Sequence, residues 1–370
     1  MRASPLARLL FLAYVLIVVY ATLYPFSGWR DSGISAFAFL FAFKPRYVSP
    51  FDLYFNVLGY VPYGLLAVLA LRPHIKGLAA FAAALVSGTA LAVILEATQT
   101  FLPTRIASNL DVLCNAAGIV LGALVGARSA GWFLGEGPLL RWRALYVMPG
   151  VRADAGLVLL GLWLLTQLNP ASLLFGAGDL RDLFRQPVGG GHEADVFVAI
   201  EALTAACNLV AVGLMGSAIL APGAPARSTL FGLISAGLFI KASAFAMLRQ
   251  ADYVFHWLTP GALIGLVTGL PVLMAAAMLP RIVRLALAAV LLMGATVLVN
   301  LAPANPYLAA ALTAWGQGHF LNFNGLTRLL SSVWPFAAVL YLILLAAHRD
   351  DDQRQSRADE GQIAPGARVE

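Results

Sequence analysis

Several polar side chains stand at the edges of apolar segments and together could bind a polar ligand. They are Asp52, Asn56, Glu96, Gln99, Arg105, Asp111 and Asn115. Carboxylates accept hydrogen bonds, an arginine offers a planar fork to an anion, and side-chain amides both donate and accept. Such a set can hold an anionic or hydroxylated ligand. A suitably buried carboxyl group could also act as a general acid or base, and Glu96 is the best candidate for that role.

The spacing places these residues on helix faces. Asp52 and Asn56 are four residues apart, and Glu96 and Gln99 are three apart, so each pair shares one face. A third face carries a polar head above a glycine seam, in the order Asp111, Asn115, Gly118, Gly122 and Gly126. Glycines spaced in this way let another backbone approach closely, which predicts a central helix. Helix packing alone would also explain the glycines.

The composition indicates the elements that must carry these residues. The chain has 370 residues, of which 60% are hydrophobic and 11% charged, and its mean hydropathy is +0.82. This excludes an ordinary water-soluble globule. The net charge of +6 is spread over the ends of apolar segments, so no nucleic-acid partner is expected. Cys114 and Cys207 lie inside apolar runs, which indicates neither a disulfide framework nor a metal site.

We therefore predict an all-α, polytopic transmembrane bundle of about ten spans, each long enough to cross about 30 Å of hydrocarbon. The predicted spans are 7–25, 51–71, 77–101, 110–127, 154–174, 196–220, 228–248, 258–279, 285–303 and 326–347. If the amino terminus is cytoplasmic, the cytoplasmic loops carry most of the lysines and arginines. The positive-inside rule then places both termini in the cytoplasm.

Loop composition predicts four parts. Residues 1–127 form a four-helix transmembrane unit, and residues 128–153, with tryptophans beside arginines, form a cytoplasmic interfacial connector. Residues 154–348 form a six-helix transmembrane extension. Residues 349–370 are polar and lack aromatic side chains, which predicts a disordered cytoplasmic tail.

With this topology, the polar residues share one level, the outer leaflet of the membrane. Asp52 and Asp111 stand at helix beginnings, where capping is an alternative explanation. Glu96 lies near a helix carboxyl end and about 10 Å below it. A carboxylate at such a position costs about 2.5 kcal/mol or more unless it is paired, hydrated or protonated.

Three hypotheses remain for the polar residues. Arg105 could clamp the carboxylates and so hold the second, third and fourth spans together, which is a structural role. The residues could instead bind a polar ligand in the outer leaflet. Catalysis is the third hypothesis, although no recognisable catalytic motif is present.

The combination resembles the VanZ-like family of bacterial membrane proteins. The resemblance covers about residues 10–127. It consists of Asp52-x-x-x-Asn56 with Pro62-x-Gly64, Glu96-x-x-Gln99, a short loop with Pro103 and Arg105, and Asp111-x-x-x-Asn115-x-x-Gly118-x-x-x-Gly122. The namesake of the family is associated with low-level resistance to teicoplanin. The resemblance implies a multi-pass protein of the bacterial cytoplasmic (inner) membrane with a role in the cell envelope. It does not extend antibiotic resistance itself to this chain.

The expected partners follow from the resemblance and the composition. They are the lipid bilayer, a lipid-linked envelope intermediate or glycopeptide-related ligand, and other membrane proteins. No cofactor and no metal are expected, since the sequence has no matching motif. The alternatives are a transporter or flippase-like carrier, a membrane enzyme acting on lipid-linked glycans, and a structural partner in an export complex.

Lys241 is a secondary candidate, because an ionisable side chain within a predicted span is a site hypothesis by default. Glu201 and Asn208 are its candidate partners on a neighbouring span. Snorkelling of Lys241 toward the outer interface, near Arg249, is the favoured alternative.

Overall fold

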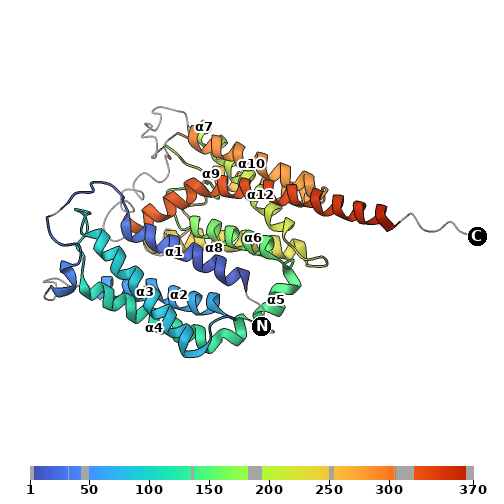
Figure 1. Ribbon diagram of the computed structural model, residues 1–370. Helices are drawn as coiled ribbons and strands as arrows, with labels where there is room; N and C mark the ends of the chain where they lie inside the picture. Colours follow the sequence, from blue (N-terminus) through green and yellow to red (C-terminus); the bar gives the residue numbers. More distant parts are fainter. Residues whose placement is uncertain are drawn as a thin grey trace, which may run out of the picture. The chain divides into compact units, whose positions relative to one another are not determined.

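The computed structural model describes residues 4–31, 33–42, 50–134, 137–181, 194–249, 254–303, 305 and 321–363, and every regular element in this part of the chain is a helix (Figure 1). The predicted all-α class is confirmed. The helices are α1 (Pro5–Leu23), the short 3-10 helix η1 (Ala38–Phe41), α2 (Pro50–Leu71), α3 (Gly77–Gln99), α4 (Asn109–Phe133), α5 (Pro138–Tyr146), α6 (Val151–Thr166), α7 (Ala194–Ala218), α8 (Ala226–Arg249), α9 (Pro260–Ala276), α10 (Arg281–Leu301) and α12 (Leu321–Ile363).

Each of the ten predicted spans contains a helix. Eight of these helices are long and apolar enough to cross a membrane. The other two, α6 and α9, have 16 and 17 residues. The span predicted at 154–174 is interrupted because α6 ends at Thr166, just before Pro170, which cannot continue a helix. The chain is a multi-pass membrane protein, and the orientation of its termini stays a prediction.

The chain divides into two compact units. The first unit comprises Met1–Val158 and Gln317–Leu326, and the second comprises Leu159–Gly316 and Thr327–Glu370. Residues 128–153, predicted as a connector, belong to the first unit and contain α5. The start of α12 also belongs to the first unit, where Gly325 packs against the ring of Tyr24.

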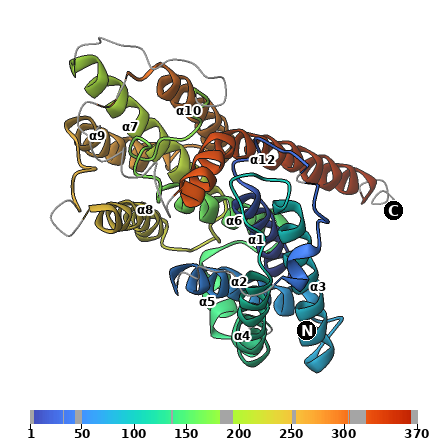
Figure 2. The same ribbon diagram turned by 90° about the vertical axis from the view of Figure 1, so that its left-hand side faces the viewer.

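In the first unit, α1 to α4 lie side by side (Figures 1 and 2). The most extensive contact is between α2 and α4, and α3 packs on both of them. The backbone segments that face Gly118, Gly122 and Gly126 of α4 belong to Val57, Val61 and Leu65 of α2. Both series advance along the chain in the same direction, so the two helices run parallel. Side chains larger than hydrogen would separate their backbones.

In the second unit, α7 packs against α9 and α10. Small residues again allow close packing, because Gly261, Gly265 and Gly269 of α9 face α7 directly. The middle of α7 is enclosed, and Leu209, Val212 and Leu214 have no exposed surface.

The last helix differs from the sequence-based expectation. Residues 349–363 are part of α12, whereas a disordered tail is expected from residue 349. This stretch contains many good helix formers, and the first proline after it is Pro365, so nothing in it stops the helix that begins in the apolar span.

The predicted orientation can be tested by cysteine labelling. In a variant lacking Cys114 and Cys207, a cysteine at Ile106 should react with an impermeant maleimide added outside intact cells, because Ile106 is 86% exposed in the α3–α4 loop. A cysteine at the exposed His74, in the α2–α3 loop, should react only after the membrane is permeabilised. The reverse labelling pattern would place the polar residues of the first unit in the inner leaflet.

Candidate functional site

The amino-terminal ends of α2 and α4 meet through a side-chain hydrogen bond. Asn56 Nδ2 donates to Asp111 Oδ1 at 2.8 Å. The parallel packing of the two helices places these residues at the same depth, as their positions in the sequence predict. Asp52 is part of α2, but its side chain lies outside the described residues.

Glu96 reaches from the last turns of α3 to the beginning of α4. Its side chain is buried, and Oε2 accepts a hydrogen bond from the backbone N–H of Ser108 at 3.1 Å. Ser108 is the N-cap residue of α4, and its hydroxyl accepts from the N–H of Leu110. The Glu96 carboxylate thus accepts from a backbone N–H at the start of α4, where such groups lack partners within the helix.

The direct ion pair between Glu96 and Arg105 that a clamp would use is not formed. Arg143–Asp154 and Arg181–Asp179 are ion pairs shorter than 4.0 Å between described residues, and Glu96–Arg105 is not such a pair. Arg105 and Asp111 nevertheless act electrostatically on Glu96, the first with the opposite charge and the second with the same charge. The three groups therefore share one electrostatic environment.

The carboxyl end of α1 completes the site. Arg105 Nη2 donates to the carbonyl oxygen of Tyr24 at 3.2 Å, and Gln99 Nε2 donates to that of Thr22 at 2.8 Å. Burial lowers the pKa of the Arg105 guanidinium, and the negative charge of Glu96 opposes this shift. Sequence analysis missed α1 as a contributor. The last carbonyls of any helix lack partners within the helix, so this feature did not single out α1 from the other helices.

Asn115 supplies a buried acceptor without a donor. The residue is 4% exposed, and its side-chain oxygen has no hydrogen-bond partner among the described residues. It lies one helical turn below Asp111. A buried polar atom without a partner costs about 1–3 kcal/mol, and such atoms usually contact an ordered water or a ligand. This oxygen is therefore a place where the site can accept a further hydrogen bond.

Tyr60 of α2 is not among the residues predicted for the site. The structure places it near Glu96, whose charge acts on it, and its side chain is buried. The β-carbon of Tyr60 also faces Gly118 of α4. Tyr60 is therefore a buried residue of the α2–α4 contact that lies near Glu96.

The secondary candidate, Lys241, lies in the second unit and is only 1% exposed. The snorkelling interpretation is thus wrong. Glu201 lies near enough to influence Lys241 electrostatically, whereas Asn208 donates to the carbonyl oxygen of Thr204 on its own helix. The partners that sequence analysis missed are in the irregular segment after α6.

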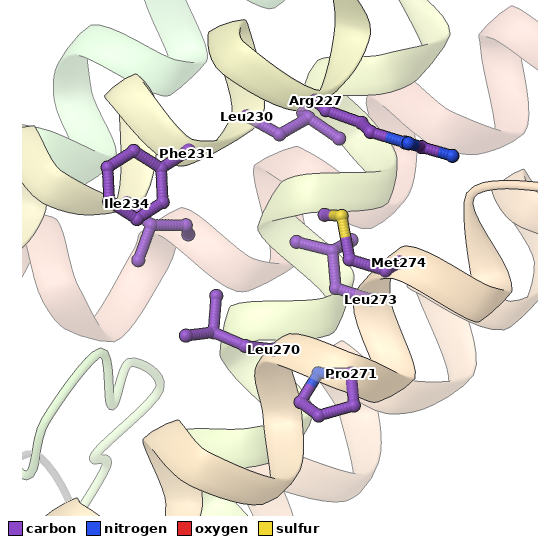
Figure 3. A pocket seen from close by; sticks show the side chains of 8 residues that line it. All are labelled: Arg227, Leu230, Phe231, Ile234, Leu270, Pro271, Leu273 and Met274. Carbon is purple, nitrogen blue, oxygen red and sulfur yellow. The ribbon is translucent and has the colours of Figure 1, made fainter.

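A hollow between α8 and α9 in the second unit is apolar, unlike the polar site of the first unit (Figure 3). Its lining consists of Arg227, Leu230, Phe231, Ile234, Leu270, Pro271, Leu273 and Met274. Arg227 is the only charged residue in this lining, and Phe231 is 64% exposed. The hollow is lined almost entirely by apolar side chains, and it lacks the convergent polar groups of a site for a polar ligand.

Comparison with known proteins agrees with the resemblance predicted from the polar and glycine motifs. Residues 11–129 match the family model described as VanZ/LLP1. Residues 11–129 of this multi-pass membrane protein form a VanZ-like region. The match includes α2, α3 and nearly all of α4, and with them every residue of the candidate site. The VanZ-like match ends before α5, so the second unit lies outside it. No curated protein and no solved structure matches the chain.

Proposed function

We propose that the VanZ-like region binds the polar headgroup of a lipid-linked envelope intermediate at the outer face of the bacterial cytoplasmic membrane. The observation that supports this most directly is the unfilled acceptor of Asn115, buried beneath charged and amide side chains from three helices. An ordered water or a ligand is the usual donor to a buried acceptor of this kind.

The chemistry of the residues suits a phosphate-linked sugar. Arg105 would bind an anionic oxygen of the headgroup, for which its planar guanidinium is well shaped. Glu96 and Asp111 would accept hydrogen bonds from hydroxyl groups. Asn56, Gln99 and Asn115 would donate and accept as the ligand requires.

The surroundings suit a ligand that arrives from the lipid. Leu113 lies between Asp111 and Asn115 in the sequence and is 66% exposed, and Ile106 beside Arg105 is also exposed. Below the polar residues, α2 and α4 contact each other through their backbones along the glycine seam. This contact leaves no polar path between the two helices. This packing favours a protein that binds its ligand at one face of the membrane over one that moves a ligand across the membrane between α2 and α4.

Loss of Arg105 should weaken binding. We expect Arg105→Ala to lower the affinity for a polyprenyl diphosphate-linked disaccharide about tenfold or more, because one charge-assisted interaction contributes roughly 1.5–3 kcal/mol. The measurement is native mass spectrometry of the full chain in nanodiscs. Arg30→Ala is the matched control, since Arg30 is an exposed arginine in an outer loop. It should bind within twofold of the original chain.

Further measurements separate a ligand site from a structural clamp. Equal binding by the Arg105→Ala variant and the original chain would contradict the proposal. A loss of protein in both Glu96→Gln and Arg105→Ala that is restored in the double variant would instead support the clamp. Phosphatidylglycerol and unmodified polyprenyl diphosphate serve as comparison lipids and show whether the site recognises the sugar or only an anionic headgroup.

A further inference from the structure

An irregular segment is buried within the second unit. Helix α6 spans about 24 Å at 1.5 Å per residue, which is less than the hydrocarbon thickness of about 30 Å. The chain then continues without regular structure over residues 167–181. Many of its side chains are enclosed: Gln167 and Phe175 have no exposed surface, and Asn169 has 3%. Irregular backbone is tolerated at membrane depth only where protein or water satisfies its polar groups.

Polar groups of α10 and α12 satisfy the far end of this segment. Asn300 Nδ2 donates to the carbonyl oxygen of Gly178 at 2.7 Å, and Asn300 Oδ1 accepts from the N–H of Leu180 at 2.9 Å. The N–H of Gly178 donates to the carbonyl oxygen of Ser331 at 2.7 Å. The segment is therefore held as a defined structure at this end.

Lys241 satisfies the near end, in the turn from Asn169 to Ser172. Its Nζ donates to the carbonyl oxygen of Asn169 at 2.7 Å, to that of Ser172 at 2.7 Å, and to the Ser172 hydroxyl at 3.0 Å. An ammonium group has three donors, and all three are used. The immediate surroundings of the positive charge are thus neutral oxygen atoms.

The negative charge that balances Lys241 lies farther away. Glu201 of α7 is 2% exposed and lies within electrostatic range of Lys241, but the pair is not among the ion pairs shorter than 4.0 Å in the described residues. Its carboxylate accepts a hydrogen bond from Thr259 Oγ1 at 2.6 Å. A cation surrounded by carbonyl and hydroxyl oxygens, with a carboxylate beyond them, is also the arrangement by which unwound membrane segments bind alkali metal ions.

We propose that the Asn169–Ser172 turn is an oxygen site for a monovalent cation and that the Lys241 ammonium is its tethered occupant. The matching ligand class is a cation of ammonium size, such as ammonium, methylammonium or potassium. The proposal concerns the second unit alone and is independent of the function proposed for the VanZ-like region. In the natural chain the site is filled, so the second unit does not depend on the cation in the medium.

Removing the lysine side chain should turn this site into one that a free cation can occupy. We expect the thermal unfolding temperature of Lys241→Ala, purified as the full chain in detergent, to rise by about 2–5 °C when methylammonium or potassium chloride replaces choline chloride at equal ionic strength. The rise should saturate with concentration. The original chain should show the same unfolding temperature in all three salts.

Two further variants make the test decisive. Lys241→Met fills the space with an apolar chain that has no donor, and it should show no cation-specific shift. If Lys241→Ala does not accumulate, the double variant Lys241→Ala with Glu201→Gln removes the uncompensated carboxylate and is tested in the same way. The absence of a cation-specific shift in whichever variant folds would overturn the proposal. Failure of both variants to accumulate even in cells grown with methylammonium would also overturn it, since the cation could then fill the site during folding.

Discussion

Replacing Gly122 by alanine is expected to lower the free energy of unfolding by about 3 kcal/mol or more. A β-carbon at this position would overlap the backbone of Val61, and the nitrogen of Leu65 would lie 2.9 Å away. Backbone atoms inside a helix cannot move aside as the end of a flexible side chain can, so α2 and α4 would have to separate. Size-exclusion chromatography after heating would show this as a lower temperature of loss of the monodisperse protein.

Gly131 provides the matched control for this substitution. It lies in the same helix, and a β-carbon there would have nothing within 4 Å. Gly131→Ala should therefore leave the unfolding temperature unchanged or raise it slightly, because alanine favours a helix over glycine. Equal behaviour of the two variants would show that the glycine seam does not determine the α2–α4 packing.

A comparably large loss is expected for Arg143→Ala. Asp154, in the first turn of α6, is 4% exposed and forms an ion pair with Arg143 of α5. Removing the arginine leaves a buried carboxylate without its cation, a change that destabilises proteins by about 3–5 kcal/mol. We expect a strongly reduced yield and a lower unfolding temperature of the purified variant.

Two companion variants identify the cause of that loss. Arg141→Ala removes an exposed arginine from the same short helix and should leave stability nearly unchanged. Asp154→Asn combined with Arg143→Ala should recover most of the lost stability, because the neutral amide has no charge to compensate. If the double variant is as unstable as Arg143→Ala, the effect comes from packing of the arginine stem rather than from charge.

The sequence was sufficient to predict most of the helices, because an apolar run in lipid must satisfy its backbone internally. The polar residues around Asn56 and Asp111 could also be assigned to one depth from their places in α2 and α4. The length of α6 could not be assigned in the same way. Hydropathy averaged over a span hides a single stopping residue such as Pro170, so a continuous helix was expected to residue 174.

The partners of the site residues were much harder to predict. Glu96 binds the backbone N–H of Ser108, and Gln99 binds the carbonyl oxygen of Thr22. Every residue offers a backbone carbonyl, and every residue except proline offers an N–H, so the sequence does not indicate which one is used. The prediction that Lys241 snorkels was wrong for the same reason, since its acceptors are mainly backbone carbonyls of a segment expected to be helical.

One piece of the first unit, which contains Gly325, is synthesised long after the rest of that unit. The start of α12 belongs to the first unit, where Gly325 contacts Tyr24, yet it is made after residues 159–316 of the second unit. Domains generally fold as the ribosome releases them, amino-terminal parts first. The VanZ-like helices must therefore wait in the membrane with the face at Tyr24 uncovered until α12 emerges.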